Sequence, residues 1–233
     1  MSAVFKREFK SYFQTPIGFI VLSVYYFFLG LYFSLIYSYG STNIDDVILM
    51  LSSVAVFTVP VITMRLFSDD RKQKVDQVLF TAPVKITAVV LGKFFAAFCL
   101  FALCFAPTVI YEIIIVCYVK TNIAVYLYSL FGMLLLGAAL VAIGMFISSL
   151  TESVVVSAVI AIIINILVLY ANSVASVLNI GFITKIASKI AFLDVLSNFS
   201  TQLFSLPDVV YFLSITAGFV FLTVRSIEKR RWA

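Results

Sequence analysis

Long apolar runs separated by short polar segments dominate the chain. Each of six runs is long enough to cross the hydrocarbon core of a bilayer, which takes about 20 mainly apolar residues in a helix. They lie at 17–37, 47–67, 92–119, 123–149, 153–171 and 208–224. This pattern predicts an all-α integral membrane protein with six transmembrane helices. The third and fourth runs exceed the required length, so we expect tilt, and Pro107 within the third run predicts a kink.

The composition indicates that lipid is the main solvent of this protein. Of the 233 residues, 63% are hydrophobic and 12% are charged, and the mean hydropathy is +1.15. A soluble domain of this length has no core large enough to hide that much apolar surface. Since the six runs and their connections use most of the chain, we expect one transmembrane domain over residues 1–233 and no built-in ATPase.

Basic residues are distributed unequally between the two sides of the predicted spans. All but three of the 16 Lys and Arg residues lie in the N-terminal segment, in and around the connection after the second span, or in the C-terminal tail. The exceptions are Lys120, Lys185 and Lys189. Because positively charged flanks resist translocation, both termini are predicted to be cytoplasmic. The net charge of +5 then reflects this asymmetry and attraction to anionic lipid, and no nucleic-acid partner is expected.

Residues 1–14 are basic and aromatic and precede Thr15-Pro16. Apolar side chains recur at helical spacing, at Val4, Phe5, Phe9, Tyr12 and Phe13, and the basic side chains lie elsewhere on the helical wheel, at Lys6, Arg7 and Lys10. The pattern predicts an amphipathic helix that lies in the inner membrane interface. The alternative is a basic flank that only sets the topology.

The connection at 68–85 is the longest cytoplasmic one and the most charged part of the chain. Ser68 is placed to cap a helix with two acids in its first turn, and Pro83 follows its end. One side of this helix carries a short apolar ridge, at Val75, Val78 and Leu79, within a charged and polar surround of Asp69, Asp70, Arg71, Lys72, Lys74, Asp76 and Gln77. Such a helix suits a groove on a cytoplasmic partner, and the alternative is a solvated helix resting on lipid headgroups.

The connection at 172–206 faces outward but is rich in apolar residues. A ridge at helical spacing is formed by Phe182, Ile183, Ile186 and Ile190. The segment is predicted to be a re-entrant or interfacial helix at the outer mouth, where it either caps a cavity or lies flat on lipid.

Few polar residues lie within the spans. Glu112 is the one acid well inside a span, which makes it a candidate for transport, although nearby Lys120 indicates the level of the lipid headgroups. Asn165 shares a face with Ser157 and Ala161, a pattern more typical of helix packing through a hydrogen bond than of substrate contact. The chain has no histidine, no phosphate-binding glycine loop and no metal-like cysteine spacing. We therefore expect no catalytic, cofactor or metal site.

Two stretches resemble the permeases of ABC-2 class ABC transporters, with the closest similarity to the gliding-motility and multidrug type branch. They are KREFKSYFQTPIGFI near the start and RLFSDDRKQKVDQVLFTAPVKITAVVLGK at 65–93. The residues that match the family pattern are Asp70, Arg71, Lys72, Leu79, Thr81, Ala82, Pro83, Val84, Gly92 and Lys93. The sequence departs from it at Lys74-Val75, where Gly-Thr is usual, and at Gln77, where Glu is usual.

This resemblance implies a permease subunit of an exporter in a bacterial cytoplasmic membrane. It further implies a second permease, identical or homologous, and two separate ATPase subunits that bind ATP and magnesium. The segment from Asp69 to Phe80 would be the coupling helix for those ATPases, and short re-entrant helices would follow the fifth span. Two other functions fit the same spans: an ion-coupled secondary transporter or channel, for which Glu112 alone is thin support, and a membrane anchor for other subunits.

Overall fold

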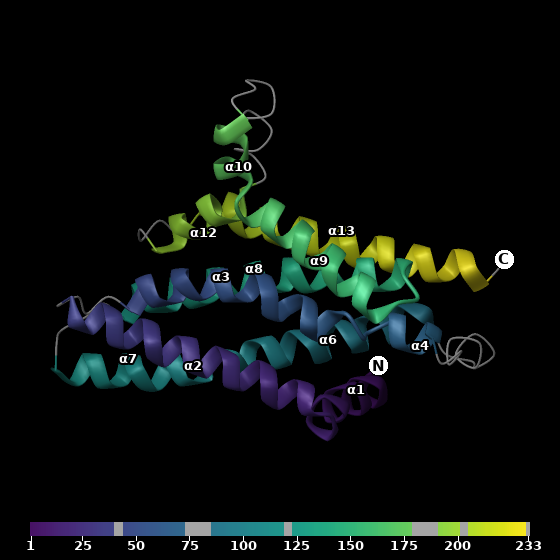
Figure 1. The fold of residues 1–233 in the computed structure, drawn as a ribbon, viewed down its shortest axis with the longest axis horizontal. Helices are drawn as coiled ribbons and strands as arrows, with labels where there is room; N and C mark the ends of the chain where they lie inside the picture. The colour runs from purple at the N-terminus through teal and green to yellow at the C-terminus, as the bar shows by residue number, and fades with distance from the viewer. Residues whose placement is uncertain (40–43, 73–84, 119–122, 179–190, 201–204, 232–233) are drawn as a thin grey trace.

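The computed structural model describes residues 1–39, 44–72, 85–118, 123–178, 191–200 and 205–231, and every regular element among them is a helix (Figure 1). The helices are α1 (Ser2–Gln14), α2 (Pro16–Ser38), α3 (Ile44–Thr63), α4 (Ser68–Lys72), α6 (Ile86–Cys104), α7 (Ala106–Tyr118), α8 (Ile123–Leu150), α9 (Val154–Leu169), α10 (Ala171–Leu178), α12 (Phe192–Ser200) and α13 (Leu206–Arg231). The all-helical fold predicted from the sequence is confirmed for this part of the chain.

Five helical stretches among the described residues are long and apolar enough to cross a membrane. They are Pro16–Ser38, Asp45–Lys72, Ile86–Tyr118, Ile123–Leu150 and Leu206–Lys229. The fifth predicted span, 153–171, corresponds to α9, which has 16 residues. At 1.5 Å per residue such a helix is about 24 Å long, shorter than the roughly 30 Å hydrocarbon core. By length and composition, five of the six predicted spans are therefore candidate membrane spans.

The central helix of the bundle is α8. It packs against α3, α6, α9, α12 and α13, and most of its side chains are buried. Close packing depends on Gly137, where an added Cβ atom would lie only 1.9 Å from Cε1 of Phe101 on α6. Small residues allow membrane helices to approach closely, because lipid gives helices little hydrophobic reason to associate.

The third span is interrupted, as the proline in its sequence predicts. The helix α6 ends at Cys104 and α7 begins at Ala106, one residue before Pro107. Proline has no N–H, so the carbonyl of Leu103 loses its usual partner four residues on. The hydroxyl of Tyr26 on α2 donates to that carbonyl at 3.2 Å instead. A side chain from another helix thus satisfies the backbone at the kink.

Both chain ends and α4 lie at the same end of the bundle (Figure 1). We call this the basic end, because every Lys and Arg residue in the described part of the chain lies on α1, between α3 and α4, on α4, at the start or in the first turns of α6, or in the last turns of α13. The predicted N-terminal helix is confirmed as α1, which ends before Pro16 at the start of α2. The opposite end carries the starts of α3 and α8 and the end of α2.

Candidate functional site at the basic end

The structure describes only the first part of the predicted coupling helix. Asp69, Asp70 and Arg71 lie on α4, at the basic end. The remaining predicted coupling residues lie outside the described residues, at Lys74, Val75, Asp76, Gln77, Val78 and Leu79. What the structure describes is therefore the short helix that precedes the rest of this connection in the sequence.

The backbone between α3 and α4 is not α-helical. We call residues 64–67 the α3–α4 break. Ser148 on α8 satisfies both sides of it: its hydroxyl accepts from the amides of Phe67 and Ser68 at 3.1 and 3.2 Å and donates to the carbonyl of Met64 at 3.1 Å. The expectation that the hydroxyl of Ser68 caps α4 is wrong. Ser68 is the first residue of that helix, its hydroxyl donates back to Met64, and Ser148 caps the helix from another span.

Two more side chains bond to carbonyls at or near the break. The hydroxyl of Tyr12 on α1 donates to the carbonyl of Ile62 at 2.9 Å. Burial raises the pKa of the Tyr12 phenol, so the hydroxyl stays protonated as a donor. The ammonium of Lys93 on α6 donates to the carbonyl of Leu66 at 2.6 Å. Side chains from α1, α6 and α8 thus hold a stretch of backbone that has no complete helical ladder of its own.

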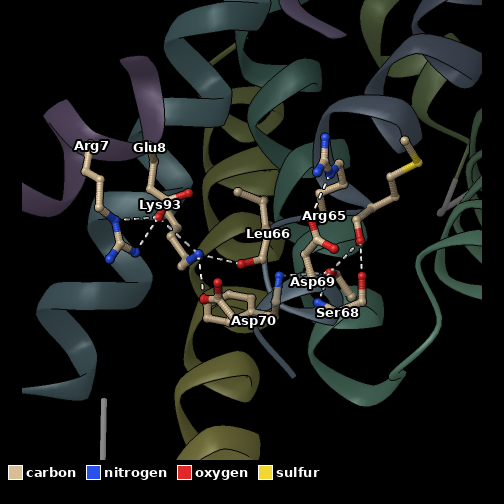
Figure 2. Close-up of polar contacts among 11 residues, drawn as sticks. Arg7, Glu8, Arg65, Leu66, Ser68, Asp69, Asp70 and Lys93 are labelled. Atoms are coloured by element: carbon tan, nitrogen blue, oxygen red, sulfur yellow. Dashed lines mark hydrogen bonds and ion pairs between the residues drawn. The ribbon is translucent and has the colours of Figure 1, made fainter. Parts of the chain in front are cut away.

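Lys93 is the centre of a buried charge cluster (Figure 2). Its side chain is 1% exposed, and its Nζ atom lies 2.9 Å from Oδ2 of Asp70, 3.3 Å from Oε1 of Glu8 and 5.2 Å from the centroid of the Phe67 ring. We call Lys93, Glu8, Asp70 and the Leu66 carbonyl the Lys93 hub. Without partners a buried ammonium costs several kcal/mol, whereas here two carboxylates, a carbonyl and a ring face compensate it.

Neighbouring ion pairs surround the hub. Arg7 lies 2.7 Å from Oε1 of Glu8, and this hydrogen bond raises the pKa of the Arg7 guanidinium. Nε of Arg65 lies 2.8 Å from Oδ2 of Asp69, one helical turn later. These charged side chains line a cavity of about 380 Å³ between α1, the start of α2, the α3–α4 break and α4. The carboxylates of Glu8 and Asp70 are therefore partly accessible to water, whereas the ammonium of Lys93 is buried.

A second set of contacts joins α4 to the turn between α8 and α9. One guanidinium nitrogen of Arg71 lies 2.5 Å from Oε1 of Glu152, and the other donates to the carbonyl of Leu150 at 3.1 Å. The side chain of Glu152 is 74% exposed, so solvent screens this pair more than it screens the hub. In all, α4 is tied directly to α6, α8 and the α8–α9 turn, and through Lys93 to α1.

Close approach of α1 to α6 positions the hub. An added Cβ atom at Gly92, next to Lys93, would lie 3.0 Å from Cβ of Val4 and 3.3 Å from the Met1 carbonyl oxygen. The absence of a side chain at Gly92 therefore lets α1 lie directly on α6. This contact brings Glu8 within reach of the Lys93 ammonium.

The other predicted site residues do not join this cluster. Glu112 is buried on α7. On the same helix, the hydroxyl of Thr108 lies 3.0 Å from that of Tyr126 on α8. Asn165 is fully buried on α9, and among the described residues neither of its amide atoms has a hydrogen-bond partner. The interhelical hydrogen bond expected for Asn165 is therefore not found.

The ridge predicted at the outer mouth lies outside the described residues, at Phe182, Ile183, Ile186 and Ile190. The helices before and after it, α10 and α12, are joined by a hydrogen bond from Asn172 to Asp194.

Four residues of the basic end were not identified by sequence reasoning as functional: Glu8, Lys93, Ser148 and Glu152. For Lys93 two signals were present: it matches the family pattern, and a lysine at the start of a predicted span needs a partner if it is buried. Glu8 and Glu152 gave no such signal, since acids near basic flanks are common. Within the described residues, no three Cys, Asp and Glu side chains gather closely enough to hold a metal ion.

The family model described as ABC-2 type transporter matches residues 1–199, well over half of the chain. The search of curated protein sequences found no match to this chain.

Proposed function

Because this chain belongs to the ABC-2 type transporter family, we propose that it is the permease subunit of an ATP-driven exporter, served by separate ATPase subunits that bind ATP and magnesium. The family is one of membrane permease components of ABC transporters, which are generally non-catalytic. The observation that carries the proposal is the anchored α4, which residues 73–84 follow in the sequence. The motif at residues 70–93 favours the gliding-motility and multidrug type branch.

The distribution of charge supports a cytoplasmic location for the basic end. In the described part of the chain, all Lys and Arg residues lie there, together with both termini. Positively charged flanks favour the cytoplasmic side of a bacterial inner membrane. An ATPase in the cytoplasm would therefore meet α4 and the loop that follows it.

Thiol labelling of whole cells tests this orientation. In a background without Cys99, Cys104 and Cys117, we expect an impermeant maleimide to label Tyr39→Cys and to leave Lys72→Cys unlabelled. Tyr39 is 85% exposed and follows α2 at the opposite end, whereas Lys72 is exposed at the basic end. After lysis both positions should react. Labelling of Lys72→Cys alone in intact cells would show the inverted topology.

Anchoring of α4 gives the loop a defined base. Contacts from Lys93, Ser148 and Arg71 fix where α4 lies, so a force applied to residues 73–84 reaches the bundle through known side chains. The ridge at Val75, Val78 and Leu79 supplies the apolar area expected of a docked helix. We infer that the ATPase binds this ridge.

Disruption of the ridge should release the ATPase. In Leu79→Asp a carboxylate replaces an apolar anchor, and burial of an unpaired charge costs several kcal/mol. We expect the amount of co-purified ATPase and its turnover in lipid to fall by on the order of tenfold or more. Lys72→Glu, at an exposed position on α4, should have a smaller effect in the same direction. Membrane insertion should not change.

A matched control is Lys229→Glu, which reverses an exposed charge at the same end of the bundle but on α13. It should leave binding and turnover unchanged. Equal binding in wild type and Leu79→Asp would place the partner elsewhere or exclude it.

A second permease, identical or homologous, completes the proposed exporter. Only 17% of the apolar window of α2 and 22% of that of α13 are buried within the chain. These surfaces are available to lipid and to the second permease.

A further inference from the structure

We propose that Lys93 is a positioning residue that makes α1 move together with α4 when an ATPase acts on the loop after α4. This inference rests on the proposed function above. It adds that α1 is a driven part of the transport cycle, held to α4 by charge.

The shared ammonium is the physical link. Glu8 on α1 and Asp70 on α4 both lie within 3.3 Å of Lys93 Nζ. Two carboxylates this close to one another would repel each other. The ammonium between them attracts both, so that Glu8 and Asp70 are held at a common centre. Because Lys93 is 1% exposed, water screens the attraction weakly. Removal of its charge would leave α1 and α4 with like charges facing each other.

The backbone does not fix α4 by itself. The α3–α4 break interrupts the helical ladder, so α4 is not a rigid extension of α3. Side chains from other helices hold the break instead, including Lys93 at the Leu66 carbonyl. A break held in this way is able to pivot while its partners remain attached, whereas a continuous helix would bend as a whole.

Close packing holds α1 against α6, the helix that carries Lys93. The contact at Gly92 places Val4 directly on α6. The hub therefore combines a close-packed contact between α1 and α6 with an ionic contact to α4. A displacement of α4 pulls on Asp70, then on Lys93, and through Glu8 on α1.

Pairs of spin labels on the full permease, reconstituted with its co-purified ATPase, test the link. One pair is Lys72→Cys with Lys229→Cys, which reports α4 against α13, and the other is Lys10→Cys with Lys229→Cys, which reports α1 against α13. All three label sites are exposed at the basic end. Each labelled permease lacks its native cysteines and is diluted with unlabelled permease, so that only distances within one chain are measured. Distances are compared before and after trapping with ATP and vanadate.

The decisive variant removes all charges of the hub at once: Lys93→Met, Glu8→Gln and Asp70→Asn. Arg7 then loses its carboxylate partner, but its side chain is 58% exposed and water solvates it, so this triple variant should keep near wild-type stability. Lys93→Arg keeps the charge and the donors and is the conservative control.

In wild type and Lys93→Arg, we expect both distances to shift on trapping. In the triple variant, the α4 distance should still shift. The ratio of the shifted to the unshifted α1 population should fall by about 2- to 30-fold, the factor by which mutations along a coupled network change the equilibrium between two states. A triple variant in which both distances shift as in wild type would overturn the inference. So would a wild type in which only α4 moves.

Failure of the proposed function gives a different result. If no ATPase co-purifies, or if neither wild-type distance shifts, the proposed function fails. The inference is then decided on the permease alone, from the Lys10→Cys and Lys72→Cys pair. A narrow distance distribution in wild type that broadens in the triple variant supports the link, and equal widths overturn it.

Discussion

Ser148→Ala should destabilise the protein by about 2–4 kcal/mol, since the amides of Phe67 and Ser68 would each lose the hydroxyl that accepts their hydrogen bonds. Each unsatisfied buried donor costs about 1–3 kcal/mol. The Met64 carbonyl would keep the donor from Ser68. Ser148 is fully buried, so little water is at hand to replace its hydroxyl. The measurement is the free energy of unfolding in mixed micelles.

The adjacent serine provides the control. Ser149 is also fully buried, but its hydroxyl donates to the carbonyl of Phe146 in its own helix. Such bonding to the preceding turn adds little to helix stability. Ser149→Ala should therefore change the free energy of unfolding by less than about 1 kcal/mol. Equal effects at the two serines would mean that the α3–α4 break does not depend on Ser148.

Gly137→Ala should destabilise the bundle by about 3 kcal/mol, near the upper end of the cost of overpacking a core. The new methyl group would lie 1.9 Å from Phe101 Cε1, whereas carbon atoms in contact are separated by about 3.5–4.0 Å. Phe101 cannot turn aside easily, because its ring is fully buried and packs against Tyr25 and Phe105 at centroid distances of 6.1 and 5.2 Å. Thermal unfolding in detergent measures the loss.

A second substitution and a control separate this clash from a general intolerance of alanine. Phe101→Leu removes the ring edge, so adding it to Gly137→Ala should cost less than the sum of the two single changes. Gly218 on α13 has no atom within 4 Å of an added Cβ atom, and Gly218→Ala should be neutral or stabilising by up to about 1 kcal/mol. Additive losses at Gly137 and Phe101 would contradict the close contact of these two residues between α8 and α6.

Much of the helical layout was predictable because a bilayer imposes a local rule. Each spanning helix must satisfy its own backbone and present apolar side chains, so α2, α8 and α13 could be located from hydropathy alone. The kink before Pro107 followed from chemistry at one position. The end of the second span was harder to predict, because α3 stops at Thr63, whereas the predicted run continues past Arg65 to the apolar Leu66 and Phe67.

The candidate site was predictable only in part. Charge and turn residues placed it in the connection after the second span, and Asp69, Asp70 and Arg71 do lie at the basic end. Hydrogen-bond partners within the chain were not predictable from spacing. The three acids that pair with Lys93 and Arg71 include Glu8 and Glu152, which lie in other segments of the basic end.

The sequence by itself determined that this protein is a bundle of membrane helices with its basic residues gathered at one end. The length of each apolar run and the position of each charge can be read directly along the chain. Only the tertiary structure decided how the charged and polar side chains at that end are used. Ser68 and Ser148 are 80 residues apart in sequence, and they meet because α8 packs along α3. Glu8 reaches Lys93 because α1 lies on Gly92. Which polar groups share a buried position depends on how the helices pack, and no local pattern specifies that.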